Sequence, residues 1–420
     1  MDTQPTLFDG MECRFNPPRY PSGHGKFGGS FLDTVRAYRE FGRETIVEQH
    51  AGITYFINEF WTKRQRAANR IHEISYRACF KPQLPRFFIK HLTDVGDRVY
   101  DPFMGRGTTL IEAALMQRVP IGNDINPLSQ ALVEPRLACP PLKEIAERLD
   151  VIPWEDFQSI SHTELLVFYH PTVLAKIEGL RNWLIERDLS GKLDMVDKWI
   201  RMVAINRLTG HSKGFFSVYT LPPNQAVSIE RQRKINQRLK QTPPVRDVKG
   251  IILQKSKSLL SHGGVQCSTF QLLSGRAEAT PEIPSNSIAL VVTSPPFLDV
   301  VNYEQDNWLR CWFMGIDPSR VPIAHHRSVE GWRNFVRSVL QELARVVKPG
   351  GHVAFEVGEV RAGKVLLEKE VIKAAEGLQL EPLGVIINDQ TFTKTANCWG
   401  VTNNTAGTNT NRIVLFRVER

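Results

Sequence analysis

Cysteine is scarce in this chain, and long apolar runs are missing from it. The six cysteines are scattered over 420 residues and form no C-x-x-C pair, so neither a zinc site nor a disulfide framework is predicted. No stretch of about 18 uncharged apolar residues is present, which argues against a membrane-spanning helix. The first residues lack a basic segment followed by an apolar one, so we expect no secretion signal. Reduced thiols in the cytoplasm are the simplest expectation.

Acidic residues are outnumbered by basic ones. The chain has 53 lysines and arginines against 44 aspartates and glutamates, a net charge of +9 and a sequence pI near 9.3. An excess of positive charge favours a polyanionic partner such as DNA or RNA. The 42% of hydrophobic residues is ordinary for a globular protein that buries a sizeable core.

The hydrophobic pattern divides the chain into four parts. Residues 1–75 combine a Pro- and Gly-rich arm with a stretch at roughly helical spacing, which predicts a helical extension. Residues 76–139 alternate short apolar strands with helices and begin a doubly wound, mostly parallel α/β sheet. Residues 140–265 predict a mainly helical insertion, and residues 266–420 return to strands and complete the same domain.

A glycine-rich loop, DPFMGRGTT, follows the first of these strands and opens a helix. Gly105 and Gly107 allow a tight turn and a close approach of the backbone to a ligand. Asp124 ends the next strand, where an acid can accept hydrogen bonds from two ribose hydroxyls. The loop is neither G-x-G-x-x-G nor a P-loop, so we predict neither a dinucleotide site nor an NTPase.

This loop strongly resembles the cofactor motif D-P-F-x-G-x-G-T-T of the DNA amino-methyltransferases. The resemblance implies a Rossmann-like methyltransferase fold and S-adenosylmethionine as the cofactor. The helix that precedes the loop, FKPQLPRFFIKHL, resembles the family helix that packs over the methionine end. Together these matches imply a set of cofactor-binding residues: Phe80, Lys81, Pro82, Asp101, Pro102, Phe103, Gly105, Gly107, Thr108, Thr109, Asp124, Ile125, Asn126, Ala277 and Glu278.

A second motif, Ser294-Pro295-Pro296-Phe297, follows the apolar strand SIALVVT. Two consecutive prolines keep the backbone extended and remove two N–H donors, so carbonyl acceptors face outward. Acceptors for both protons of a base amino group favour a pyramidal nitrogen with an available lone pair, and the gain comes from positioning and electrostatics. We expect Ser294 and the Pro295 carbonyl to accept these protons and Phe297 to stack on a flipped base.

The tetrapeptide resembles the S-P-P-[YF] motif of cytosine-N4 methyltransferases, whereas adenine-N6 enzymes more often carry D-P-P-Y or N-P-P-[YF]. The chain contains no Pro-Cys pair, the nucleophile that a cytosine-C5 enzyme needs. One position departs from the family: many relatives have Gly-Asp-Ala where this chain has Gly275-Arg276-Ala277. Arg276 cannot accept a hydrogen bond from the adenine amino group, so either Glu278 or a backbone carbonyl substitutes for the acid, or the cofactor binds weakly.

The order of the motifs places the helical insertion where this family carries its target-recognition region. Between residues 229 and 257 nine basic residues face two acidic ones, which suits contacts with phosphates. We expect nucleic-acid contacts from one group of basic residues: Arg207, His211, Lys213, Arg231, Arg233, Lys234 and Arg238.

The resulting hypothesis is a site-specific DNA cytosine-N4 methyltransferase in restriction–modification, with double-stranded DNA as its partner and a cognate restriction endonuclease as a functional partner. Three alternatives stay open: an adenine-N6 DNA methyltransferase, an RNA base amino-methyltransferase, and a catalytically weak regulator that binds the cofactor and DNA. Arg276 is the feature that favours the regulator.

Overall fold

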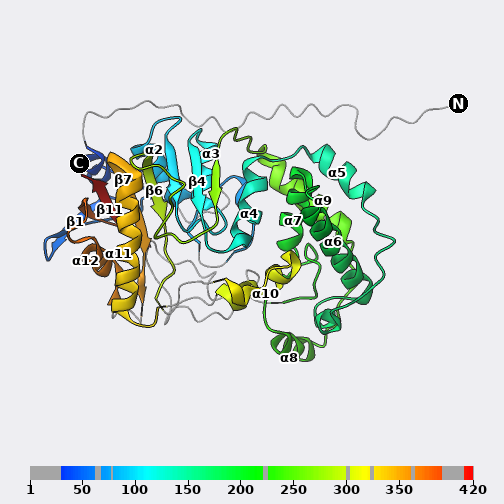
Figure 1. Cartoon of the computed structure of the whole chain (residues 1–420). Helices are drawn as coiled ribbons and strands as arrows, with labels where there is room; N and C mark the ends of the chain where they lie inside the picture. Colours follow the sequence, from blue (N-terminus) through cyan, green and yellow to red (C-terminus); the bar gives the residue numbers. More distant parts are fainter. Residues whose placement is uncertain are drawn as a thin grey trace.

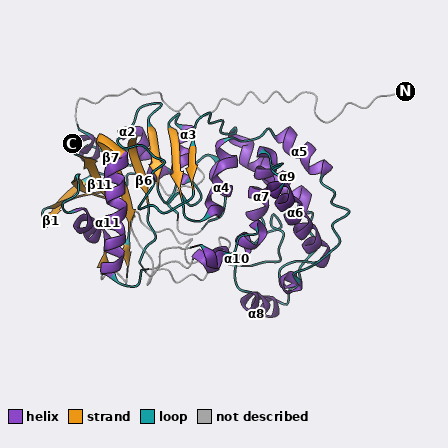
Figure 2. Cartoon of the chain, in the orientation of Figure 1, coloured by secondary structure: helices purple, strands orange, loops and turns teal. Residues whose placement is uncertain are grey.

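The computed structural model describes residues 30–61, 68–76, 79–220, 226–298, 303–321, 326–360, 365–389 and 411–419. Within these ranges, nine strands form one mixed sheet, and helices lie on both of its faces and in a separate group beside it (Figures 1 and 2). The strands of the sheet are β1 (Ile46–His50), β2 (Ile53–Asn58), β3 (Arg98–Asp101), β4 (Val119–Asn123), β5 (Gln271–Leu273), β6 (Ile288–Thr293), β7 (Val347–Val357), β10 (Leu380–Asn388) and β11 (Asn411–Val418). Two short strands, β8 (Glu359–Val360) and β9 (Val365–Leu366), pair separately.

The strand order in the sheet is β1-β2-β10-β11-β7-β6-β3-β4-β5. Five neighbours, β5, β4, β3, β6 and β7, are parallel, and β11 runs antiparallel between β7 and β10. From β3 the chain winds outward through β4 to β5, then returns to the other side of β3 as β6. This order confirms the predicted Rossmann-like methyltransferase fold, and it puts the switch point, where doubly wound sheets bind ligands, between β3 and β6.

Helices cover both faces of the sheet. On one face, Phe88 and Ile89 of α2 (Gln83–Leu92) share a buried cluster with Leu290 of β6. On the other, Val336 and Leu340 of α11 (Val329–Val346) belong to a second cluster, together with α12 (Leu367–Ala375). A strand that is buried on both faces reads as a continuous apolar run, as β6 does in the sequence.

The expected helical extension is wrong for residues 46–58. Of the described residues before position 76, α1 (Phe31–Arg36) and the 3₁₀ turn Arg70–His72 are helical, whereas β1 and β2 form an antiparallel hairpin that joins the sheet beside β10. Ala51 and Gly52 both have positive φ angles, 51° and 79°. Two positive φ angles are typical of a two-residue hairpin turn whose twist matches that of the flanking strands. The apolar residues of ITYFIN therefore serve a strand and not a helix. Residues 1–29 and 62–67 lie outside the described residues.

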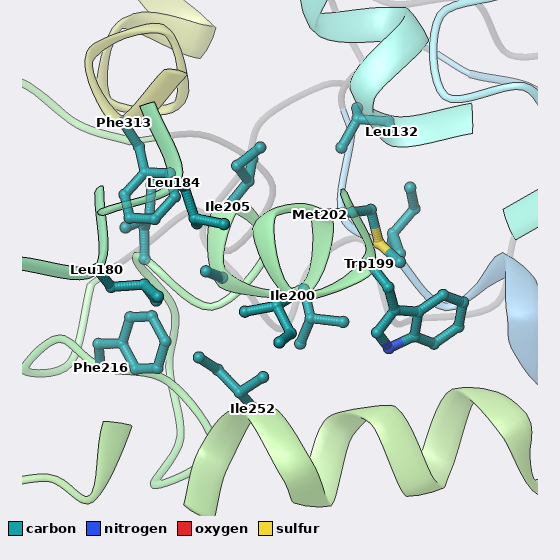
Figure 3. Close-up of a cluster of buried hydrophobic side chains, with 14 of the residues drawn as sticks. Leu132, Leu180, Leu184, Trp199, Ile200, Met202, Ile205, Phe216, Ile252 and Phe313 are labelled. Carbon is teal, nitrogen blue, oxygen red and sulfur yellow. The ribbon is translucent and has the colours of Figure 1, made fainter. Parts of the chain in front are cut away.

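The predicted helical insertion is confirmed, and it packs as one body with two helices from the flanking segments. Its helices are α5 (Leu142–Val151), α6 (Pro171–Leu189), α7 (Met195–Ile205), α8 (Ile229–Leu239) and α9 (Val248–Leu259). Figure 3 shows Ile200 and Met202 of α7 at the centre of their shared core, with Leu132 and Phe313 at its rim. Leu132 comes from α4 (Pro127–Leu137) and Phe313 from α10 (Tyr303–Met314).

The remaining helices are short or lie next to the site. They are α3 (Thr108–Leu115) and the 3₁₀ turns Arg70–His72, Thr163–Val167, Leu260–His262 and Pro318–Arg320. None of the helices in the described ranges has the length and hydrophobicity that a membrane span requires.

A substitution at Gly107 tests how tightly α3 packs against α4. Gly107 precedes α3 with a φ angle of 74°, and a Cβ there would lie 2.5 Å from the Val133 side chain. We expect Gly107→Ala to lower the free energy of unfolding by about 2–4 kcal/mol through backbone strain and overpacking. Gly96→Ala is the matched control, because Gly96 has a φ angle of 85° but no atom within 4 Å of the added carbon.

Urea unfolding would measure both variants. Backbone strain alone costs roughly 1–2 kcal/mol, which is the loss expected for the control. Equal losses for Gly96→Ala and Gly107→Ala would contradict the steric part of this account.

Candidate active site

A cavity of about 530 Å³ lies at the carboxyl ends of β3, β4, β5 and β6. Four of its walls follow strands of the sheet: the loop after β3, the residues after β4, the residues after β5, and the start of the S-P-P-F motif after β6. A fifth wall comes from the first turns of α11. This volume is within the range of small-molecule sites, roughly 300–1,000 Å³.

The glycine loop turns back over the end of β4. Gly105 has a φ angle of 48°, and its N–H donates to Asp124 Oδ2 at 2.8 Å. The other carboxylate oxygen, Oδ1, accepts the N–H of Asn126 at 2.9 Å. Burial raises the pKa of Asp124, and the two backbone donors oppose this effect. The acid predicted to hold a ribose is therefore fixed by backbone hydrogen bonds at the edge of the cavity.

The cofactor loop is tied to the neighbouring strand β6. Thr293 Oγ1 donates to Asp101 Oδ1 at 2.6 Å, and Thr109 Oγ1 donates to the Val292 carbonyl at 2.9 Å. Burial raises the pKa of Asp101 to about 7, while the bonds from Thr293 and from the Phe103 N–H act in the opposite direction. These contacts set the distance between the glycine loop and the residue that follows Thr293.

Ser294 is hydrogen-bonded to a buried carboxyl group that the sequence analysis missed. Its hydroxyl bonds Glu356 near the end of β7, and Asn411 at the start of β11 donates to Glu356 Oε1 at 2.7 Å. Burial raises the pKa of Glu356 to about 7, and the bonds from Ser294 and Asn411 limit the rise. The one signal in the sequence was an acid within the apolar run HVAFEV.

The catalytic tetrapeptide is pinned by α11. Trp332, which is fully buried, donates its indole N–H to the Pro296 carbonyl at 2.9 Å. This bond occupies the second proline carbonyl of the motif. The Pro295 carbonyl is the acceptor that we expect for the target amino group.

The wall over the glycine loop comes from Tyr76, Cys79 and Phe80, and none of these three residues belongs to a strand of the sheet. Arg106 of the loop donates to the carbonyls of Ile74 at 3.0 Å and Phe80 at 3.4 Å. Arg310 of α10 donates to the Ser75 carbonyl at 3.1 Å. These bonds hold Tyr76 and Phe80, together with the Cys79 thiol, against the cavity.

Most of the predicted site residues meet at this cavity. Those that line it are Phe80, Asp101, Pro102, Phe103, Gly105, Thr108, Asp124, Ile125, Asn126, Ala277, Glu278, Ser294 and Pro296. Those that do not line it are Lys81, Pro82, Gly107, Thr109, Pro295 and Phe297. Gly107 and Thr109 shape the loop through the contacts given above, and Pro295 is buried. Phe297 packs against the core beneath α11, so its expected stacking on a base has no support here.

Arg276 also lines the cavity, at its exposed rim. Its side chain is 71% exposed and donates to Glu278 Oε1 at 2.7 Å. The guanidinium therefore engages the carboxylate that was expected to replace the missing acid.

The predicted nucleic-acid contacts separate into two groups. Arg231, Arg233, Lys234 and Arg238 are exposed on α8, whose buried side contains Gln232 and Ile235. Arg207 is buried, and its guanidinium lies 4.0 Å from the centre of the Phe215 ring. Because Arg207 packs inside the helical part, it does not make the phosphate contact that the sequence predicts for it. His211 and Lys213 are exposed, and residues 221–225, which follow them in the helical insertion, lie outside the described residues.

The strand order and the cavity at the switch point define the class as an α/β protein of Rossmann-like methyltransferase fold. A narrower similarity comes from known sequences. The N6 and N4 family described as DNA methylase matches residues 43–133, which include the glycine loop and Asp124 and end before Ser294. Two of the curated relatives are Type II methyltransferases. M.MjaII of Methanocaldococcus jannaschii is 40% identical over 75 residues, 18% of this chain and 14% of that protein.

The other relative, M.MvaI of Kocuria varians, is 39% identical over 74 residues, 17% of this chain and 16% of that protein. The chain thus matches less than a fifth of the length of either relative. Similar solved structures include TrmN from Thermus thermophilus, with a TM-score of 0.32 at 12% identity over 85% of this chain and 52% of that chain. The rRNA methyltransferase aviRa from Streptomyces viridochromogenes has a TM-score of 0.31 at 13% identity over 85% of this chain and 93% of that chain.

The raised pKa of Glu356 predicts a pH-dependent stability difference between the protein and its Glu356→Gln variant. The pKa is about 7 in the folded state and near the usual 4.5 in the unfolded state. The folded state therefore binds this proton more tightly, and the stabilisation is fully present below pH 4.5 and lost as pH rises through 7. The glutamine of the variant has no ionisable group, so its contribution to stability does not change with pH. Its stability relative to the wild type should rise between pH 5 and pH 8, by at most about 1.4 kcal/mol per pH unit.

Urea unfolding at several pH values would measure this difference. The pKa of Asp101 is raised in the same direction. Because Asp101 is present in both proteins, its contribution cancels in the difference between their stabilities. Glu381→Gln, at an exposed position of β10, is the control and should show no such trend. A difference for Glu356→Gln that does not change with pH would contradict the assignment.

Proposed function

We propose that this protein transfers a methyl group from S-adenosylmethionine to the exocyclic N4 amino group of cytosine in DNA. The observation that carries the proposal is the meeting of two motifs in one cavity. The glycine loop after β3 and Ser294 after β6 line it together, although they lie almost two hundred positions apart in the sequence. The match of residues 43–133 to the DNA methylase family supports the same class of reaction.

The residues around the cavity fit S-adenosylmethionine. The backbone of the glycine loop and the wall formed by Tyr76 and Phe80 would hold the methionine part. Asp124 would accept hydrogen bonds from the ribose hydroxyls, because its carboxylate lies at the cavity edge in a fixed orientation. When bound, the cofactor supplies an electrophilic methyl group on a sulfonium sulfur.

The residues of the catalytic motif would bind and activate the amino group of the target base. Because the Ser294 hydroxyl donates to Glu356, its oxygen lone pairs remain available to accept one N–H. A backbone carbonyl of the motif would accept the other, which directs the nitrogen lone pair towards the methyl group. As the new N–C bond forms, the nitrogen must lose a proton. Ser294 would take this proton and pass its own to ionised Glu356, which the pKa of about 7 makes a suitable acceptor.

The basic face of α8 would contact the phosphates of the DNA. Its exposed arginines and lysines lie on the helical part, beside the cavity-bearing sheet (Figure 1). Phosphate contacts position the duplex without reading its sequence. The target base would then have to leave the stack to reach Ser294.

Serine at the first position of the tetrapeptide favours cytosine over adenine as the target. Adenine N6 would use the same acceptors, so it is the first alternative outcome of the assay. The names of the two relatives, both Type II methyltransferases, favour a role in restriction–modification, in which a cognate endonuclease would act on the same DNA site.

The deciding experiment is transfer of labelled methyl from S-adenosylmethionine to unmethylated plasmid DNA, followed by mass spectrometry of the nucleosides. We expect N4-methylcytosine. Ser294→Ala should reduce the rate of transfer at least about 100-fold, because it removes an acceptor from the transition state, and should leave the affinity for the cofactor unchanged. Ser287→Ala, at the opposite end of β6, is the matched control and should retain full activity.

The other outcomes separate the alternatives. N6-methyladenine would change the base and keep the site, and label in RNA alone would change the substrate class. No label in either nucleic acid would favour the binding regulator. A fully active Ser294→Ala variant would overturn the catalytic assignment.

The proposed phosphate contacts predict a change in salt dependence. Arg238→Gln removes an exposed cation of α8 and should reduce the slope of log K against log salt by about 1. Lys143→Gln is the control of equal charge, because Lys143 is exposed on α5, at the other end of the helical part from α8 (Figure 1). Fluorescence anisotropy with duplex DNA at several salt concentrations would measure both. Equal slopes for Arg238→Gln and the wild type would remove α8 from the DNA interface.

A further inference from the structure

One stripe of α11 faces the loop that follows β5. Residues 334, 338 and 342 are four positions apart, so their side chains lie on the same side of the helix. Glu342 Oε1 accepts the Thr280 N–H at 2.7 Å and the Thr280 hydroxyl at 2.6 Å. From this anchor the stripe continues towards the cavity, where Ser338 and Asn334 form part of the wall.

Aromatic rings flank the same part of the cavity. Phe335 of α11 and Phe103 of the glycine loop both line it, and their ring centres are 5.9 Å apart at an angle of 55°. His326 stacks on Phe335 at 4.9 Å. Aromatic side chains in this arrangement favour the binding of a flat ring against their faces and edges. This end of the cavity therefore suits a purine.

The polar groups at this end are mostly engaged with the protein itself. Glu278 accepts a hydrogen bond from Arg276 at 2.7 Å, and the Ser338 hydroxyl donates to the backbone carbonyl of Asn334 at 3.3 Å. The side-chain amide of Asn334, by contrast, makes no hydrogen bond with any described residue, and it is on the exposed side of α11 that borders the cavity. An amide offers one acceptor and two donor hydrogens side by side.

We propose that Asn334 reads the adenine ring of S-adenosylmethionine, in place of an acid at position 276. The amide oxygen accepts from the adenine 6-amino group, and the amide N–H donates to the adjacent ring nitrogen, a pairing that asparagine makes with adenine elsewhere. Arg276 holds Glu278 in an ion pair at the rim, so α11 supplies the recognition that the loop after β5 does not. This inference rests on the proposed function, because it takes S-adenosylmethionine as the ligand.

A comparison of two ligands and several variants tests the proposal. Calorimetry on the full-length protein would give the affinity for S-adenosylhomocysteine and for its analogue that lacks the 6-amino group of the purine. The wild type should prefer the amino ligand by about 3- to 10-fold, the value of one hydrogen bond. Asn334→Ala should bind the two ligands within twofold of each other. Asn334→Asp keeps the acceptor oxygen and should retain the preference.

Ser338→Ala is the matched control on the next turn of α11. Its hydroxyl bonds the helix backbone, so the preference for the amino ligand should persist in this variant. If Asn334→Ala keeps the wild-type preference, Asn334 does not read the purine, and the proposed function stands. If the wild type binds neither ligand, the cofactor assignment of the proposed function fails, and this inference fails with it.

Discussion

The site depends on the pairing of β3 with β6, and on one hydrogen bond at the end of these strands. Val99 pairs with Leu290 and Tyr100 with Val291, so the two strands end side by side. The 2.6 Å bond from Thr293 to Asp101 then fixes the spacing between the glycine loop and the tetrapeptide that follows Thr293. A shift of one residue in this register would turn Ser294 to the other face of the sheet. The glycine loop and the start of the S-P-P-F motif therefore face one cavity only in this register.

Two buried carboxyl groups belong to this part of the structure, Asp101 in the cavity wall and Glu356 next to Ser294, and both accept hydrogen bonds from neutral donors. Asp101 accepts from Thr293 and from a backbone N–H, while Glu356 accepts from Ser294 and Asn411. Burial disfavours the charged form of each carboxyl group, and the hydrogen bonds favour it. Because neither has a basic partner among these contacts, their pKa values stay near 7. Of the two, Glu356 is the one hydrogen-bonded to Ser294, the first residue of the S-P-P-F motif.

The helical part is attached to the catalytic sheet through shared packing and not through a linker. Leu132 of α4 and Phe313 of α10 lie in its core (Figure 3), and α10 begins shortly after the tetrapeptide. Arg310 of α10 also holds Ser75 in the cofactor wall. A surface on the helices that binds DNA would therefore have a fixed position relative to both halves of the site.

The sequence alone determined the fold class, the two motifs and most of the cavity residues, because glycines after a strand and prolines after a strand restrict the backbone locally. It also predicted the helical insertion from its periodicity. It was wrong about β1 and β2, since a helical spacing of charged residues outweighed the hairpin pattern around Ala51 and Gly52. Only the tertiary structure brought Glu356 and Asn411 next to Ser294, and the first turns of α11 to the cavity. These residues come from β7, β11 and α11, which the strand order brings together over long sequence separations. Such contacts leave no local sequence pattern from which they could be predicted.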